Sequence, residues 1–241
     1  MSTVKPLRSD GKETRDKMKA VAQRLFALHG IDGVSATDIV AATGQRNKAS
    51  VQYHFGSKEA LIGELLVDGA KKVDAFRQEM LDEMAATGKP PTVREVLGAF
   101  ILPVHRLTVT EAEGGTYLRF LSNVQSTHRP LFRQYIGNQW NTGYRRCLQH
   151  FRELLAHLPG PLLEQRLSLV AIYTTAVLSI KEAPLDEAHS PSRLWLPEFT
   201  LDNILDTFQA MLECAPSAAT LAGLPGQLEN GAAKSSRTRK E

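Results

Sequence analysis

The sequence predicts an all-α protein, with a small three-helix domain at the amino end and a larger helical domain after it. Apolar residues recur at intervals of three and four along most of the 241 residues, which is the spacing of one helix face. Serines that can begin helices, Ser35 and Ser57, precede such stretches, and glycines or prolines follow them. With 42% hydrophobic residues, the chain can bury a sizeable core.

Composition divides the chain into four parts. We expect a disordered polar arm over 1–12, a three-helix domain over 13–56, a larger helical domain over 57–215 and a disordered basic tail over 216–241. The expected helices cover residues 13–29, 35–43, 47–55, 57–86, 93–107, 116–126, 130–158, 162–181 and 198–213.

The first short helix of the amino domain has clear local signals. Ser35 is the expected N-cap, and Asp38 follows at the capping-box spacing, so that each can satisfy a free backbone amide of the first turn. Gly44 is placed to end this helix in the left-handed conformation. These signals predict a helix of about two turns followed by a tight turn.

A second short helix is expected to begin near Asn47 or Lys48. Val51 and Phe55 are four residues apart and therefore share its buried face. Hydrogen-bond donors occupy the other faces: Arg46, Lys48, Ser50, Gln52, Tyr53 and His54. Two short helices with an exposed, donor-rich second member have the layout of a helix-turn-helix, in which the second helix enters the DNA major groove.

Charge is unevenly distributed. Residues 1–58 hold ten Lys/Arg and five Asp/Glu, whereas residues 59–233 hold fifteen and twenty, and the last eight residues hold four and one. A basic first part followed by an acidic remainder indicates a polyanionic partner for the first part alone. The alternative is that the basic residues form an ordinary solvated face. Arg15 and Lys19 of the first helix are either solvated or in contact with phosphate.

One string of residues resembles a known family. The segment YHFGSKEAL, residues 53–61, is similar to the end of the DNA-binding domain of TetR/AcrR-family transcriptional regulators, and residues 14–44 fit the first two helices of that domain. Three residues, Gln45-Arg46-Asn47, lie between the glycine and Lys48, which resembles a subgroup whose turn reads R-N.

The resemblance implies double-stranded operator DNA as a partner. We expect Lys48, Gln52 and Tyr53 to reach bases, with Gln52 suited to an adenine edge and Lys48 to guanine or phosphate. The alternative for His54 is a histidine packed against the first helix. The expected DNA-contacting set is Ser35, Thr37, Arg46, Asn47, Lys48, Ser50, Gln52, Tyr53, His54 and Lys58.

The resemblance also implies a homodimer. The stretch 162–181 is apolar nearly all round, which predicts either a core helix or an interface helix. In the family the last two long helices of each subunit form a four-helix bundle, so we expect pairing through about 162–181 and 198–213. Two copies related by a dyad would bind a pseudo-palindromic operator.

A small-molecule effector is implied as well, because the larger domain of such proteins usually holds a pocket. Aromatic and polar residues suit a pocket, but aromatic residues at helical spacing are more often core. The arginine-rich stretch from Arg119 to Arg152 either recognises an anionic ligand or is solvated. The expected pocket residues are His105, Tyr117, Phe120, Asn123, Tyr135, Trp140, Tyr144 and Thr174.

Other classes lack support in the sequence. The two cysteines, Cys147 and Cys214, are far apart, so we expect no disulfide framework, no metal and no cofactor. No apolar leader or membrane-length segment is evident, and we expect a soluble, cytoplasmic protein. The P-loop, HExxH and G-x-S-x-G motifs are absent, so we expect no enzyme. The prediction is a ligand-responsive regulator, most simply a repressor; the alternative is an all-helical small-molecule-binding enzyme, or a redox sensor using Cys147, without DNA binding.

Overall fold

The structure, a computed structural model, describes residues 9–45, 47, 49–110, 115–137, 139–182, 195 and 197–224. Within these ranges the regular structure is entirely helical, as the sequence predicts. The helices are α1 (Ser9–His29), α2 (Ala36–Ala42), α3 (Ser50–Phe55), α4 (Lys58–Ala86), α5 (Val93–Thr110), α6 (Tyr117–Thr127), α7 (Arg129–Ile136), α8 (Thr142–Leu154), α9 (Gly160–Lys181), α10 (Thr200–Glu213) and α11 (Ala218–Ala222).

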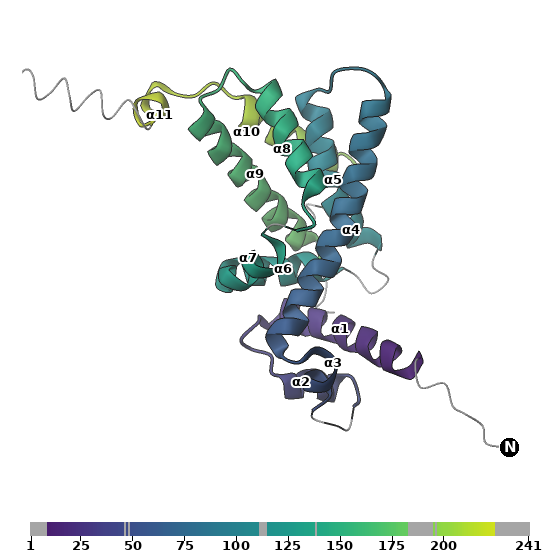
Figure 1. The fold of residues 1–241 in the computed structure, drawn as a ribbon. Helices are drawn as coiled ribbons and strands as arrows, with labels where there is room; N and C mark the ends of the chain where they lie inside the picture. The colour runs from purple at the N-terminus through teal and green to yellow at the C-terminus, as the bar shows by residue number, and fades with distance from the viewer. Residues whose placement is uncertain are drawn as a thin grey trace, which may run out of the picture.

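Helices α1, α2 and α3 form one end of the molecule, and α4 leads away from them into the remaining helices (Figure 1). The side chains at the centre of this end are apolar and almost completely buried, which explains why helices of six and seven residues are stable here. The buried set is Met18, Ala22, Phe26, Ile39, Val40, Val51 and Phe55.

The long helix α4 joins the two ends of the molecule. Its 29 residues span about 43 Å at the helical rise. Two glycines on this helix allow aromatic rings to pack directly on its backbone: a Cβ on Gly63 would lie 2.2 Å from the Tyr135 ring, and one on Gly69 would lie 2.1 Å from the Tyr117 ring. Helices α6 and α7, which carry these rings, are therefore held close to α4.

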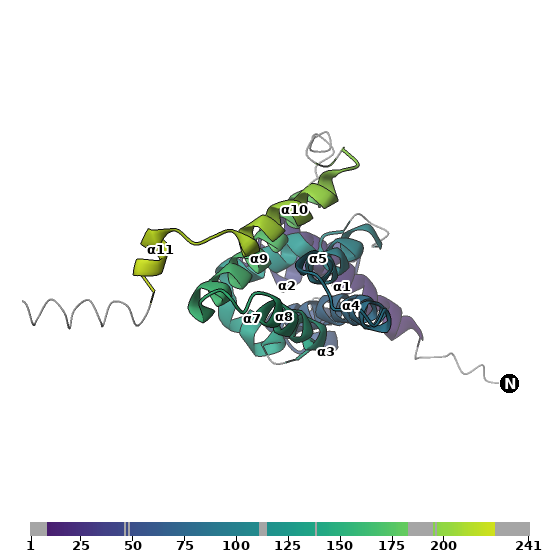
Figure 2. The same cartoon turned by 90° about the horizontal axis from the view of Figure 1, so that it is seen from above.

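The other end is a bundle in which α5 and α8 pack on α4, and α9 packs on α5, α6 and α10. Viewed from above, α9 and α10 lie side by side along one flank (Figure 2). Pro103 lies inside α5, which continues to Thr110 instead of ending at about residue 107. Where α9 ends, the buried carboxylate of Glu182 accepts hydrogen bonds from the backbone amides of Leu118 (3.0 Å) and Arg119 (2.8 Å) and so caps α6.

Three expectations about the helices are wrong. The helix expected over 130–158, with a bend near Gly137 or Gly143, is two helices: α7 ends at Ile136, α8 begins at Thr142, and Trp140 between them adopts a φ of 56°. Helix α1 begins at Ser9, inside the arm expected to be disordered. The tail expected to be disordered from 216 contains α11, where Ser217 accepts a hydrogen bond from the amide of Thr220 at 3.2 Å.

Some of the segments between the expected helices are not decided. Residues 111–114 and 183–194 lie outside the described residues, as does most of the basic tail. The division into domains at residues 56 and 57 stays a prediction. Among the helices that the structure describes, none has the combined length and hydrophobicity that a membrane span needs.

Candidate nucleic-acid interface and internal cavity

Helix α2 is fixed by contacts at both of its ends. The backbone amide of Asp38 donates to the Ser35 hydroxyl oxygen at 3.2 Å, and the Ser35 amide and hydroxyl both donate to the Asp38 carboxylate, at 2.8 and 2.6 Å. These hydrogen bonds, chiefly the one from the Ser35 side chain, lower the pKa of Asp38. The predicted capping box is confirmed, but the hydroxyl proton of Ser35 is already used and is not available to a phosphate.

Helix α2 ends in a Schellman motif. Gly44 has a φ of 72°, its amide donates to the Ala41 carbonyl at 3.0 Å, and the amide of Gln45 donates to the Val40 carbonyl at 3.2 Å. A glycine relieves the steric cost of this left-handed conformation. The predicted end of the helix at Gly44 is confirmed.

Helix α3 begins at Ser50, two or three residues later than expected. The Asn47 side-chain oxygen accepts from the Ala49 amide at 2.9 Å, a local turn that competes with helix, and the Ser50 hydroxyl donates to the Asn47 carbonyl at 2.6 Å. Ser50 is buried, so its predicted DNA contact is corrected to a role in the turn. Arg46 and Lys48 lie outside the described residues.

The outer face of α3 is polar and open. Val51 and Phe55 are buried as predicted, whereas Gln52 is exposed and the Tyr53 side chain is 83% exposed. Helices α2 and α3 lie at the end of the molecule farthest from the bundle (Figure 1). Thr37 and Asn47 are exposed as well, and His54 is half-buried. The described surface thus presents hydrogen-bonding side chains with no helix covering them.

Lys58 has a partner within the protein. Its ammonium donates to the Ile31 carbonyl at 2.6 Å and lies 5.7 Å from the centre of the Phe26 ring. This contact holds the start of α4 against the α1–α2 loop. Since an ammonium has three donors, two remain for a phosphate.

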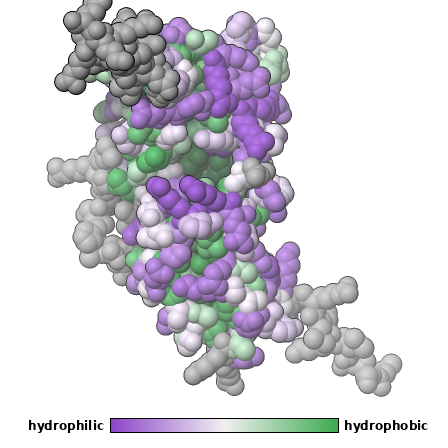
Figure 3. Space-filling view, turned by 60° about the vertical axis from the view of Figure 1, so that its left-hand side comes forward, coloured by the Kyte–Doolittle hydropathy of each residue, from purple (hydrophilic) through white to green (hydrophobic). Residues whose placement is uncertain are grey.

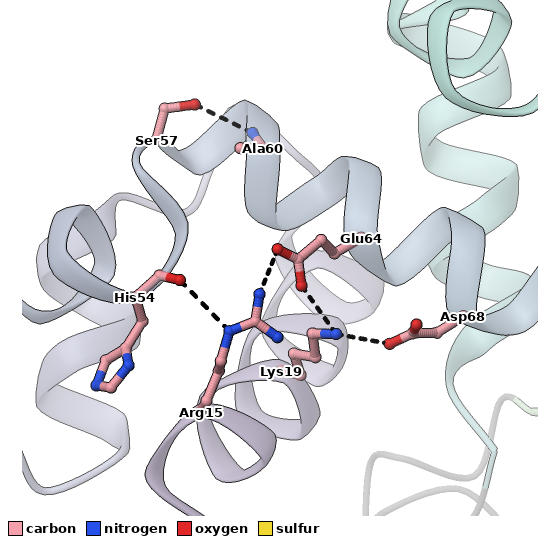
Figure 4. A network of polar contacts seen from close by, with 7 residues as sticks. All are labelled: Arg15, Lys19, His54, Ser57, Ala60, Glu64 and Asp68. Carbon is pink, nitrogen blue, oxygen red and sulfur yellow. Dashed lines mark hydrogen bonds and ion pairs between the residues drawn. The ribbon is translucent and has the colours of Figure 1, made fainter. Parts of the chain in front are cut away.

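Two basic residues of α1, expected to be solvated or in contact with phosphate, hold α1 to α4. Arg15 pairs with Glu64, and its Nε donates to the His54 carbonyl at 3.4 Å, while Lys19 lies 2.9 Å from Glu64 and 2.8 Å from Asp68 (Figure 4). Burial opposes the charge of Lys19, but the hydrogen bonds with Asp68 and Glu64 outweigh it, and its pKa is raised. These cations stabilise the junction between α1 and α4.

A cavity of about 510 Å³ lies in the bundle between α4, α5, α6, α7, α8 and α9. This volume is typical of small-molecule sites. Hydrophobic surface (green) gathers at mid-height on the side of the molecule where α9 lies, with hydrophilic surface (purple) above and below it (Figure 3). Four of the eight predicted pocket residues line the cavity: Tyr117, Trp140, Tyr144 and Thr174.

The other four predicted pocket residues do not line it. Asn123 donates to the Phe26 carbonyl at 2.8 Å and so ties α6 to α1. Phe120 is fully buried in the core, and the ring of Tyr135 packs on Gly63. His105 contacts the Lys181 ammonium, and burial together with that charge lowers its pKa to about 4.

Sequence reasoning missed Arg77, which lines the cavity with a side chain only 6% exposed. Its Nη2 donates to the Phe100 carbonyl at 2.9 Å, while its Nε is buried without a hydrogen-bond partner among the described residues. Burial lowers its pKa, although arginine stays protonated. The signal was available, because Arg77 is four residues after Val73 and therefore on the buried face of α4.

Comparisons with known proteins identify the amino-terminal part. Residues 20–65 match the model for "Bacterial regulatory proteins, tetR family". The chain carries the DNA-binding domain of the tetR family. No curated protein sequence matches this chain.

Two solved structures are similar to this chain over most of its length. The crystal structure of AmtR from Mycobacterium smegmatis is similar with a TM-score of 0.52 and 18% identity, over 92% of this chain and 96% of that chain. The crystal structure of the superantigen pfit gives a TM-score of 0.48 and 17% identity, over 89% of this chain and 92% of that chain. At 18% identity, the likeness to AmtR concerns the fold.

The tetR-type domain contains α2 and α3, so the exposed polar face described above belongs to a DNA-binding, transcription-regulating domain. All the described residues that line the cavity follow residue 65, so the cavity lies outside the matched range. Helix α4 begins within that range and ends in the cavity-containing bundle. Cys147 is buried, and burial raises the pKa of its thiol to about 11, which is unlike a reactive cysteine. The described residues contain no cluster of three His, Cys, Asp or Glu side chains suited to a metal.

Proposed function

We propose that the protein is a homodimeric transcriptional repressor that binds a pseudo-palindromic operator through α3 and leaves it when a small molecule fills the cavity. The observation that supports this best is the exposed face of α3 in a tetR-type domain. Gln52 and Tyr53 point away from the core while Val51 and Phe55 anchor the helix. A helix held in this way can enter the major groove without unfolding its own domain.

In this proposal Gln52 forms a hydrogen-bonded pair with an adenine edge, and Tyr53 packs at the groove or on the backbone. Thr37, Asn47, His54 and the free N–H groups of Lys58 contact phosphates. Arg46 and Lys48 keep the base and phosphate contacts that the sequence predicts. Ser35 and Ser50 are left out, because their hydroxyls serve the caps and the turn.

Dimer formation is proposed through α9 and α10. Leu169, Tyr173 and Ile180 are exposed to 37%, 42% and 49%, and helical spacing places them on one face of α9 with Ala176. Exposed apolar surface of this kind marks interaction sites. Because α3 has six residues, one copy can read few base pairs, and a second copy doubles the contacts. Light scattering is expected to give the mass of a dimer at micromolar concentration; a monomer would contradict this part of the proposal.

The release step is proposed to act through α4 and α6, which line the cavity and also hold α1. Helix α6 contributes Tyr117 and Leu118 to the cavity wall, and its Asn123 binds the Phe26 carbonyl of α1. Helix α4 holds α1 through its acidic residues. A ligand that moves either helix therefore moves α1, and in a dimer it changes the spacing of the two α3 helices.

The test is a mobility-shift titration with the DNA upstream of the gene and a scrambled duplex of the same composition. We expect wild-type protein to prefer the upstream DNA, and Gln52→Ala to lose about 1–3 kcal/mol of operator binding and its base preference. Gln149→Ala, which alters an exposed glutamine of α8, is the matched control. Equal losses on every duplex for Gln52→Ala would contradict the base-reading role.

A further inference from the structure

The wall of the cavity is apolar but carries net positive charge. The described residues that line it include three arginines and no carboxylate. Arg77 comes from α4, and Arg129 and Arg133 come from α7 on the exposed side of the cavity. Most of the remaining wall is aliphatic or aromatic, with Val73, Phe100, Val104, Leu118, Leu121 and Phe132 among its members. A ligand that complements this wall has an apolar body and a negative group.

Arg77 is a buried cation that faces the rings of Phe100 and Tyr144, at 5.4 and 6.0 Å, but has no ion pair among the described residues. Its side chain is buried, and no carboxylate of the described residues lies within 4.0 Å of its guanidinium. The nearby carboxylate of Asp74 is committed elsewhere, since it accepts from the Gly143 amide and from the Gln78 side chain, each at 2.8 Å. A buried charge left in this state is costly unless a bound anion completes it. The unpartnered Nε adds a free donor at the same place.

We propose that the effector is an amphipathic monocarboxylate, whose carboxylate binds Arg77 and whose hydrocarbon body lies against Val73, Phe100 and Val104. This assignment rests on the proposed ligand-responsive function and adds the chemical class of the ligand. Arg129 and Arg133 attract the anion toward the cavity from its exposed side.

The chemistry of Arg77 favours a carboxylate over other anions. One edge of a guanidinium matches the two oxygens of a carboxylate, and one Nη of Arg77 is already bound to the Phe100 carbonyl. A dianionic phosphate would bring a second charge into an apolar site and lose more hydration. A cationic ligand would meet three arginines and no acid.

Calorimetric titration of the full chain with decanoate, decan-1-ol and decylamine tests this proposal. These probes share one hydrocarbon chain and differ in the charge of the head group. We expect decanoate to bind about 10- to 100-fold more tightly than decan-1-ol, the range of a charge-assisted hydrogen bond, and decylamine to bind least. Equal affinities for decanoate and decan-1-ol, or no binding of either at millimolar concentration, would overturn the proposal.

Substitutions of single arginines test where the carboxylate of decanoate binds. Arg77→Gln is expected to reduce decanoate affinity to that of decan-1-ol, while Arg145→Gln, an exposed arginine of α8 outside the cavity wall, leaves it unchanged. Circular dichroism checks that Arg77→Gln folds. If it does not fold, Arg133→Gln on the exposed side of α7 replaces it, with an expected loss of about threefold that disappears at high salt. Decanoate affinity that survives both arginine substitutions would overturn the assignment.

The mobility-shift assay separates this proposal from the function on which it rests. Operator binding by the ligand-free protein is measured first and must be the same for wild type and Arg77→Gln. Decanoate is then expected to release wild-type protein from DNA but not the variant. Tight binding of decanoate without release would uphold the carboxylate assignment and contradict the ligand-responsive function.

Discussion

The junction between α1 and α4 and the cavity wall farther along α4 differ in how their cations are compensated. At the junction, Arg15 and Lys19 meet the carboxylates of Glu64 and Asp68. In the cavity wall, Arg77 has no ion pair among the described residues. The paired charges fix how two helices pack, whereas Arg77 has a carbonyl and aromatic rings as neighbours and would gain a partner of opposite charge from a bound anion. The cations of α1 that have carboxylate partners thus differ from Arg77 of α4, the cation for which we propose a bound ligand.

The largest expected effect comes from Gly69, which lies on α4 between the two regions. A Cβ there would come within 2.1 Å of the Tyr117 ring, so Gly69→Val forces α6 away from α4. We expect the free energy of unfolding to fall by about 1–3 kcal/mol, measured by urea denaturation. Gly98→Ala is the control, because its new Cβ would lie 3.8 Å from Leu102; it is expected to be neutral or stabilising by up to about 1 kcal/mol. Equal effects of the two substitutions would mean that α6 does not pack closely on α4.

A smaller effect distinguishes the two kinds of cation directly. Lys19→Met leaves Asp68 without its cation, and we expect unfolding free energy to fall by about 1 kcal/mol, because the site is partly screened by solvent. Arg77→Met removes a buried charge that lacks an ion pair and is expected to leave stability unchanged or higher in the absence of ligand. Lys17→Met, at an exposed site on α1, is the control. A larger loss of unfolding free energy for Arg77→Met than for Lys19→Met would contradict the distinction between the two cations.

The smallest effect is a dependence on pH. His105 faces Lys181, and its pKa in the folded protein is about 4, whereas it is about 6.5 in the unfolded chain. Between these values the unfolded chain binds more protons, so stability falls as pH falls from about 6.5 to about 4. Because His105 is partly exposed, we expect this effect to be about 1 kcal/mol between pH 7 and pH 5. The free energy of unfolding of His105→Gln should therefore fall by about 1 kcal/mol less than that of wild type over this range. Parallel pH profiles for wild type and variant would contradict this placement of the histidine.

The parts of the fold that depend on neighbouring residues were predictable from the sequence. The cap of α2 needs only Ser35 and Asp38, its end needs only Gly44, and the length of α4 follows from one apolar stripe. The start of α3 was placed too early because the Asn47 side chain makes a turn that helical spacing does not reveal. The break before α8 depends on the left-handed conformation of Trp140, which a tryptophan does not signal.

The cavity was only half predictable, because tertiary packing decides which face of a helix turns inward. Asn123 and Phe120 lie on the face of α6 that packs on α1, whereas another face of the same helix lines the cavity. Arg77 was overlooked because a charged side chain is usually assumed to be solvated, although its position four residues after Val73 is a core position. Helical spacing therefore located the buried faces, and only the three-dimensional arrangement identified the cavity wall.

The carboxylate of Glu182 connects the end of α9 with the start of α6. This side chain follows the last turn of α9 and accepts hydrogen bonds from the first turn of α6. Helix α6 is in turn hydrogen-bonded to α1 through Asn123. In the proposed dimer, a shift of α9 against the other subunit would therefore be transmitted through α6 to α1, which packs on α2.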